Sequence, residues 1–594
     1  MKLPVALVLL AAVLPSTTAF HLGSGHQKFY DIERRNDKGS TSLDKRTSCE
    51  NSASNRACWG NYSIDDDWYT TIPDTGVTRE YWLVAQNTTL APDGYERYTM
   101  NFNGSIPGPT ISADWGDNVI VHVTNNLQNN GTALHMHGIR QQNNTQYDGV
   151  PGATQCPIAP GATFTYKFRA TQYGTTWYHS HYSLQYSDGL LGAIVIDGPA
   201  SANYDVDLGP MLISDWFHES VASLWDYARI GIPPVAENGL INGTNTFDCS
   251  DSNSSACLGT GVRNEIVVEK NTTYRLRLIN TAIEGYIRFK IDGHSFSVIA
   301  MDLVPIVPYD TDSIVIANGE RYDIVFTANA TDDNYWLRAI YNSDCGTYNA
   351  YNANIKGIVR YNASSTDDPT TTTQNYTAQC YDEDYSNLVP YVSQTVGSAA
   401  TEFSTELNYT YNDDIWRWTI NSSSLIVNWS EPTIVQFYEA DGAADLSWST
   451  DANVWEIPNA SEWVYFILHD ESTSDLGHPM HLHGHDFFIL DSGNGTFDES
   501  TLSSLNLINP PRRDTAVLPG DGYLVIAFRP NNPGAWLMHC HIAWHASEGM
   551  GIQFLEQADI LLDTLDNYDQ IETGCKSWDE YALPGITTQD DAGI

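Results

Sequence analysis

The chain has few basic residues for its length. It carries 29 Lys and Arg against 73 Asp and Glu in 594 residues, a formal net charge of −44. Such an acidic protein repels phosphate backbones and anionic lipids, which argues against nucleic acid or a membrane surface as a partner. Charged residues make up only 17% of the chain, whereas apolar residues reach 42% and aromatic residues 12%. This composition excludes a disordered, collagen-like or coiled-coil protein and favours about three to four β-rich domains.

Long apolar runs are also missing, apart from a short one at the start of the chain. Residues 1–19 combine one Lys, an apolar run and small residues up to Ala19, which predicts a cleaved secretory signal peptide. An N-terminal membrane anchor is the alternative, but the run is short for a membrane span. Residues 20–46 are polar and end in Lys45-Arg46, which predicts a propeptide and a mature chain from Thr47. Many Asn-x-Ser/Thr sites, such as Asn61 and Asn87, support a secreted, extracellular glycoprotein.

The nine cysteines form an odd number, so at least one has no disulfide partner. Their spacing suggests the pairs Cys49–Cys58, Cys249–Cys257 and Cys345–Cys380, with Cys156–Cys575 as a long-range link. Spacing alone does not fix connectivity, so this pairing is a hypothesis. Cys540 is left over, between His539 and His541. A free thiol in an oxidising compartment needs a reason, and metal binding is the best one.

Helical periodicity is scarce, and short alternating runs take its place. Such runs cover 118–127, 163–170, 265–270 and 522–530, separated by Gly/Pro turns. This pattern predicts an all-β chain of sandwiches or barrels. Similar short sequences recur among the predicted strands, which suggests repeated β-domains. We place the domains at 47–200, 201–385 and 386–594.

Eleven of the seventeen histidines fall in four short clusters, and each cluster contains a His-x-His pair. On an extended chain the two rings of such a pair lie on one face, which makes half a metal site. A single pair is more often a polar strand or a simple zinc site, but four pairs in a secreted chain indicate several metal ions. The pairs are His135/His137, His179/His181, His481/His483 and His539/His541. His485, inside the third cluster, is set aside as a non-ligand.

The cluster around Cys540 points to redox chemistry. If the backbone is extended, His539 and His541 face one way and Cys540 the other, so one tripeptide can reach metal centres on both sides. Two histidines, one cysteine and a weak axial methionine describe a blue-copper site, here His478, His545, Cys540 and Met550. Zinc is the alternative, but it has no redox chemistry that could use such a link. The pattern predicts one-electron oxidation at the cysteine site, with electrons passing through Cys540 to a cluster that reduces dioxygen.

Five motifs in this order resemble the multicopper oxidases, most closely the secreted laccases of filamentous ascomycete fungi. They are NGSIPGPTI (103–111), YDGVPGATQCPI (147–158), WYHSH (177–181), HPMHLHGHDF (478–487) and HCHIAWH (539–545). The resemblance covers nearly all of the mature chain. It implies three cupredoxin-like domains and four copper ions, with a trinuclear cluster between domains 1 and 3 and a type 1 copper in domain 3.

The resemblance also implies the role of each ligand. The type 1 copper would take His478, Cys540 and His545, with Met550 axial and His545 as the point where electrons enter. The type 2 copper would take His135 and His481. The two type 3 coppers would take His137, His179, His181, His483, His539 and His541.

Two acids are candidates for proton delivery during dioxygen reduction. Asp148 matches an acid that the family places beside the trinuclear cluster, although an Asx-turn before Gly149 explains it equally well. The chain ends Asp591-Ala592-Gly593-Ile594. This resembles the C-terminal plug of ascomycete laccases, imperfectly, and a frayed tail is the alternative.

The leading function is a laccase, which couples one-electron oxidation of small phenolic or aromatic donors to reduction of dioxygen to water. Another multicopper oxidase, acting on ascorbate, bilirubin-like tetrapyrroles or metal ions, is the first alternative. A secreted copper-binding protein without turnover is the second. Met550 stands where ascomycete laccases usually have Leu, so we expect a lower type 1 potential than in a Leu-bearing relative. We expect a monomer.

Overall fold

A computed structural model describes residues 49–331, 333–373, 376–377, 379–412, 414–442, 446–457, 462–582 and 589–594 of the chain. The predicted signal peptide and propeptide, residues 1–46, lie outside the described residues. Among the described residues, no helix is long and apolar enough to cross a membrane.

Strands dominate the fold and form three two-sheet sandwiches after a short hairpin of β1 (Cys58–Trp59) and β2 (Tyr62–Ser63). The first sandwich contains β3 (Thr78–Leu90), β4 (Arg97–Phe102), β5 (Ile111–Asp114), β6 (Asn118–Asn125), β7 (His135–Met136), β8 (Thr163–Arg169), β9 (Gly174–His179) and β10 (Leu191–Asp197). The second contains β11 (Val206–Trp216), β12 (Asn238–Ile241), β13 (Glu265–Val267), β14 (Thr273–Asn280), β15 (Ile287–Ile291), β16 (Phe296–Met301), β17 (Val304–Thr311), β18 (Ile314–Ile316), β19 (Arg321–Thr327), β20 (Asn334–Tyr341) and β21 (Lys356–Arg360). The third contains β22 (Ala399–Asn412), β23 (Ile415–Ile420), β24 (Val454–Ile457), β25 (Trp463–Asp470), β26 (His478–Leu482), β27 (Phe487–Asn494), β28 (Arg512–Arg513), β29 (Thr515–Leu518), β30 (Gly522–Phe528), β31 (Gly534–Cys540) and β32 (Gly551–Glu556).

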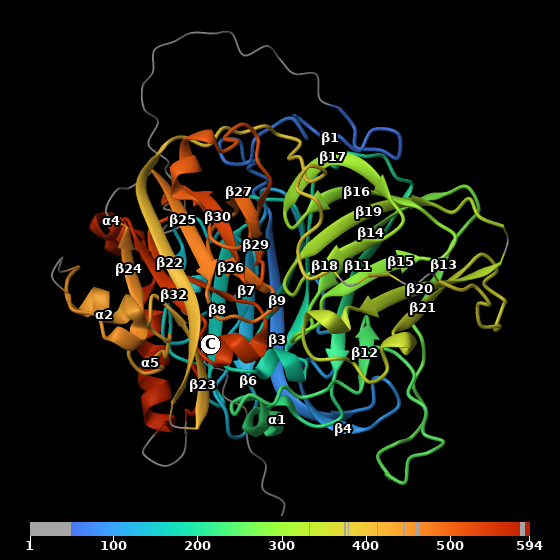
Figure 1. Ribbon diagram of the computed structural model, residues 1–594, viewed down its shortest axis with the longest axis horizontal. Coiled ribbons are helices and arrows are strands. Elements are labelled where there is room, and N and C mark those ends of the chain that lie inside the picture. Colours follow the sequence, from blue (N-terminus) through green and yellow to red (C-terminus); the bar gives the residue numbers. More distant parts are fainter. Residues whose placement is uncertain are drawn as a thin grey trace, which may run out of the picture. The chain divides into compact units, whose positions relative to one another are not determined.

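The same pairing scheme recurs in all three sandwiches. In one sheet of each, the first strand pairs parallel with a second, which pairs antiparallel with a third: β3-β6-β8, β11-β14-β19 and β22-β25-β30. In Figure 1 the green strands of the second sandwich lie together, apart from the orange and red strands of the third. The predicted all-β fold of repeated domains is therefore confirmed, while the exact domain limits stay predictions.

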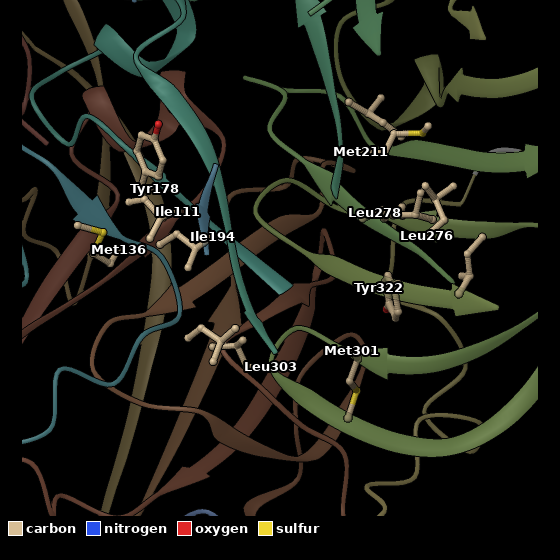
Figure 2. Close-up of a cluster of buried hydrophobic side chains, with 14 of the residues drawn as sticks. Ile111, Met136, Tyr178, Ile194, Met211, Leu276, Leu278, Met301, Leu303 and Tyr322 are labelled. Carbon is tan, nitrogen blue, oxygen red and sulfur yellow. The ribbon is translucent and has the colours of Figure 1, made fainter. Parts of the chain in front are cut away.

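The expected strand runs are present because their alternation gives each strand one buried face. β6 alternates half-buried and buried residues along its whole length, and β8 and β30 occupy the runs predicted at 163–170 and 522–530. One hydrophobic core extends from the first sandwich into the second. Figure 2 shows this core, with Met136 and Tyr178 on strands of the first sandwich and Leu276 and Met301 on strands of the second.

Helices are few: α1 (Val221–Ala228), α2 (Thr433–Glu439), α3 (Ala543–Ser547), α4 (Ala558–Thr564) and α5 (Tyr568–Tyr581). Helix α5 was not predicted from the sequence, although Ile571, Cys575 and Trp578 recur at helical spacing and are its buried residues. All four proposed disulfides are present, and Cys156–Cys575 ties α5 to the first sandwich. Cys540 is free and buried, as expected.

Candidate metal centres

Strand register sorts the residues around Cys540 onto two faces of one sheet. β26 and β31 are neighbours, with His481 opposite His539 and Met480 opposite Cys540. Because side chains alternate along a strand, His539 and Cys540 point to opposite faces. His539 accordingly groups with His181 and His483, whereas Cys540 groups with His478 and His545. This is the two-sided arrangement expected for the tripeptide.

The eight paired histidines converge from the first and third sandwiches into one buried cluster. Their ring nitrogens form three groups, within each of which all ligand atoms lie within 4.8 Å of one another. The groups are His137, His179 and His541; His181, His483 and His539; and His135, His137 and His481. All eight rings are buried, with exposed fractions of 0–4%. The structure therefore brings together all eight histidines that the His-x-His pattern singled out.

Hydrogen bonds fix the tautomer of five of these rings. The Nδ1 atoms of His135, His179, His481 and His539 contact backbone carbonyl oxygens at 2.8–3.1 Å, and His483 Nδ1 lies 2.9 Å from Asp148 Oδ2. A carbonyl oxygen accepts only, so Nδ1 carries the proton and Nε2 keeps its lone pair. All five Nε2 atoms are buried and have no hydrogen-bond partner. Such outer contacts orient a histidine for metal binding.

Burial favours the neutral form of several of these imidazoles. Desolvation, followed by repulsion among the rings themselves, holds the pKa of His137, His179 and His483 well below its usual value. Burial lowers the pKa of His539 to about 4. Neutral rings with unpartnered nitrogens are the state in which histidine binds a cation.

Three ligand atoms meet on the other face of the sheet. Cys540 Sγ lies 3.6 Å from His545 Nδ1 and 3.9 Å from His478 Nδ1, and the two Nδ1 atoms are 3.2 Å apart. An ion about 2.0 Å from each nitrogen and about 2.3 Å from the sulfur fits such a triangle. Burial raises the pKa of the Cys540 thiol and lowers the pKa of His478 to about 4. A bound cation would reverse the first effect, because a coordinating thiol loses its proton.

Met550 is tied to this triangle through its backbone. The Met550 amide donates to the carbonyl of His545 at 2.9 Å, and the Cys540 amide donates to the carbonyl of Met550 at 3.2 Å. The Met550 side chain is buried in the same apolar core as Cys540. The axial role of its sulfur stays a prediction.

Asp148 contacts one histidine from each of the two sandwiches that form the cluster. Its Oδ1 lies 3.2 Å from His135 Nδ1, in the first sandwich, and its Oδ2 lies 2.9 Å from His483 Nδ1, in the third. Asp148 therefore accepts hydrogen bonds from two rings of the cluster, from His135 through its backbone carbonyl and from His483 through its carboxylate, which a simple Asx-turn does not require. Whether it also moves protons stays a prediction.

Sequence reasoning missed a support that reaches the cluster from the second sandwich. Asp514 accepts a hydrogen bond from His481 Nδ1 through its carbonyl at 2.8 Å, and its Oδ1 lies 3.3 Å from His137 Nε2. Arg321, on β19, binds both oxygens of the Asp514 carboxylate at 2.6 Å. The signal was the charged triplet Arg512-Arg513-Asp514 directly before the apolar strand β29, which indicates buried ion pairs.

The C-terminal tail is buried rather than frayed. Ala592 N donates to the carbonyl of Ser547 at 2.8 Å, and the Trp429 indole donates to the carbonyl of Gly593 at 3.0 Å. Ser183 donates to the Asp591 carboxylate. A small cavity of about 20 Å³ lies between Ile594 and a set of cluster residues that includes His179, His181, His539 and His541. Burial, followed by repulsion from Asp590, raises the pKa of Asp591 to about 7.

The donor sets fit copper. Two histidines and a thiolate in a triangle match a blue-copper site, and imidazole clusters with free lone pairs suit several borderline ions. His485 stays outside these groups: its Nδ1 contacts the His483 carbonyl at 3.0 Å and its Nε2 lies 3.0 Å from Glu556 Oε1.

Sequence profiles of the multicopper oxidase family match residues 84–201, 207–364 and 426–559. Laccase-2 from Botryotinia fuckeliana is 50% identical over 551 residues, which cover 92% of this chain and 94% of that protein. The crystal structure of the laccase from Botrytis aclada matches with a TM-score of 0.88 at 50% identity, covering 92% of this chain and all of that one. Fet3p, a multicopper oxidase that functions in iron import, matches with a TM-score of 0.74 at 25% identity, covering 84% and 95%. The three cupredoxin-like domains are confirmed, and the chain belongs to the multicopper oxidase family, the copper-dependent oxidoreductases.

Proposed function

We propose that the protein is a laccase that oxidises phenolic and aromatic donors one electron at a time and reduces dioxygen to water. One observation carries the proposal. Cys540 lies in a two-histidine triangle on one face of β31, while the adjacent His539 belongs to the eight-imidazole cluster on the other. A protein that only stores copper has no need of a covalent path between two such centres.

The ligand assignment follows the three groups of rings. His478, Cys540 and His545 would hold the type 1 copper, with Met550 axial. His135 and His481 would hold the type 2 copper. The two type 3 coppers would be held by His137, His179 and His541 and by His181, His483 and His539. When bound, the four coppers would supply one-electron acceptance at the type 1 site and, counted together with the other three ions, the four electrons that reduce one dioxygen to water.

His545 is the ring through which a donor would deliver its electron. It is 8% exposed, the highest value among the twelve candidate ligands. Aromatic rings surround it: the Trp418 ring centroid lies 4.7 Å from that of His545, and Trp544 precedes it in the chain and packs against Phe217. Such surroundings suit an aromatic donor better than a hydrated metal ion.

Two carboxylates are placed to support the proton balance of dioxygen reduction. Asp148 holds His135 and His483 and lies fully buried beside the cluster. Asp591 lies in the tail beside the cavity, and its pKa of about 7 lets it both take and give a proton near neutral pH. We assign both to proton delivery.

Secretion is part of the same proposal. Four disulfides in the described residues suit an oxidising compartment, and the apolar run within residues 1–19 has the composition of an export signal. The monomeric state stays a prediction.

A donor panel tests the function. Dioxygen uptake is measured with 2,6-dimethoxyphenol, ascorbate and Fe(II) on protein of known copper content. A laccase prefers the phenol, whereas a preference for ascorbate or Fe(II) supports another multicopper oxidase. His481→Ala is the matched control: it should abolish uptake, and unchanged uptake would indicate that the cluster does not react with dioxygen.

A further inference from the structure

Two tyrosines and two tryptophans form a ladder across the hairpin β22–β23. Tyr409 pairs directly with Trp418 and Tyr411 with Trp416 in the antiparallel register. Residues two apart on paired strands share a face, so all four rings lie on one side of the hairpin. Figure 1 shows β22 and β23 side by side along the third sandwich.

The rings form a continuous path that ends on the candidate type 1 ligand. Their centroids are 5.3 Å apart from Tyr411 to Trp416, 4.8 Å from Trp416 to Tyr409 and 5.5 Å from Tyr409 to Trp418. Trp418 then lies 4.7 Å from the His545 ring and 5.0 Å from the His478 ring. Every step is a ring contact in the range that aromatic pairs adopt.

Exposure falls steadily along this path. Tyr411 is 53% exposed, Trp416 and Tyr409 are half-buried, and Trp418 is 7% exposed. The indole of Trp418 donates to Glu548 at 2.8 Å, which fixes its orientation against His545. The ladder therefore connects solvent with a ring that is itself only 8% exposed.

An apolar surface borders the middle of the path. The Trp416 amide donates to the Arg229 carbonyl at 2.7 Å, and a Cβ added at Gly231 would meet the Trp416 indole at 2.2 Å. Two large apolar side chains beside this contact, Tyr227 and Ile232, are 55% and 56% exposed. A surface of this kind suits a phenolic polymer rather than a small polar solute.

We propose that Tyr411, Trp416, Tyr409 and Trp418 relay electrons to His545 from phenolic polymers too large to reach that ring. The inference rests on the laccase function proposed above. Tyrosine and tryptophan are the side chains most easily oxidised by one electron. Each ring can therefore pass an electron to the next ring towards His545 and regain one from the ring nearer the surface. A surface phenol loses one electron and, as it becomes a phenoxyl radical, releases its proton to water. The electron would refill the ladder, and a type 1 copper held by His478, Cys540 and His545 would be the oxidant that accepts it.

The first test compares one phenol in two forms, free 2,6-dimethoxyphenol and the same phenol coupled to agarose beads. In Tyr411→Phe, which keeps the ring but removes the easily oxidised phenol, oxidation of the beads should fall about tenfold while kcat/KM for the free phenol stays within about twofold. Tyr98→Phe is the matched control, because Tyr98 is 58% exposed on the first sandwich. Equal rates on the beads in Tyr411→Phe and Tyr98→Phe would overturn the proposal.

The second test does not depend on turnover. The oxidised holoenzyme, without donor, is illuminated with tris(bipyridine)ruthenium and persulfate, and oxidised tryptophans are mapped by peptide mass spectrometry. The buried Trp418 should be modified in the wild type and several-fold less in Trp416→Phe, whereas the fully buried Trp536, outside the ladder, stays intact. Equal modification of Trp418 in both proteins would overturn the relay. A wild type that oxidises neither free nor bound phenol refutes the laccase function, while this second test still decides whether the ladder carries charge.

Discussion

The two candidate metal centres lie on opposite faces of one sheet but are built differently. The triangle of His478, Cys540 and His545 comes entirely from the third sandwich and sits in an apolar core. The eight-imidazole cluster draws on two sandwiches for its rings and on the second for Arg321. Carboxylates accept hydrogen bonds within and around the cluster, whereas at the triangle Asp470 Oδ2 lies 3.7 Å from His478 Nε2. The triangle therefore depends on local chain geometry, and the cluster depends on the assembly of the whole molecule.

Cys540→Ser should have the largest effect, because it removes the sulfur of the triangle while leaving the cluster intact. We expect loss of the blue absorption band and of donor oxidation below detection, with the cluster copper retained. Visible spectra and metal analysis on the same sample check this. A retained blue band would show that Cys540 is not the ligand.

Arg321→Leu should damage the cluster and spare the triangle. The change leaves the Asp514 carboxylate buried without its bidentate partner, which costs about 3–5 kcal/mol of unfolding free energy. Denaturant unfolding measures this cost, and copper analysis should show loss from the cluster with the blue band kept. Arg321→Lys is the milder control, since lysine keeps the positive charge but cannot bind both carboxylate oxygens as the planar guanidinium does. Unchanged stability in Arg321→Leu would contradict the support from the second sandwich.

Asp148→Asn tests the contacts of Asp148 with the cluster, with little change in shape. The amide removes the charged acceptor of His483 and the negative charge beside His135, so copper affinity of the cluster or dioxygen uptake should fall about 10–100-fold. Equilibrium dialysis and oxygen electrodes measure the two quantities. A changed blue band with unchanged dioxygen uptake would show that Asp148 supports the triangle and not the cluster, which would contradict its assigned place.

The triangle is built locally and the cluster is assembled from several sandwiches, and this difference decides how much of each centre the sequence predicts. His-Cys-His on an extended strand predicts the two-sided arrangement because alternation is local. The cysteine spacing suggested four pairs without fixing them, and the structure contains all four. Arg321 and Asp514 are 193 residues apart in sequence and meet only because the second and third sandwiches pack there. No local pattern predicts that contact. The helix α5 was missed for another reason: its buried residues follow a helical period in a chain that otherwise alternates like strands.

Asp591 should give the docked tail a pH dependence. Its ordinary pKa of 3.8 rises to about 7 on burial, so the folded form holds its proton more tightly than the unfolded one. Docking is therefore fully stabilised below about pH 4, and this stabilisation is lost as pH rises through about 7. Hydrogen exchange of the Ala592 amide, which is bonded to Ser547, should accelerate over that window beyond its intrinsic rate. Asp591→Asn, which does not titrate, should remove the dependence, and an identical profile in both proteins would refute it.

Met550→Leu should have the smallest effect on stability, below about 1.5 kcal/mol, because the two side chains are similar in volume. The backbone bonds of Met550 to His545 and Cys540 do not involve its side chain. Loss of the thioether should raise the type 1 potential, since an axial ligand stabilises the oxidised ion. A redox titration of the blue band checks this, and an unchanged potential would show that the Met550 sulfur is not axial.

Crystal diffraction collected at the copper absorption edge tests the central claim most directly. We expect four anomalous peaks, one within the His478–Cys540–His545 triangle and three among the eight paired imidazoles. A triangle without copper, or Cys540 joined to another cysteine, would contradict the account.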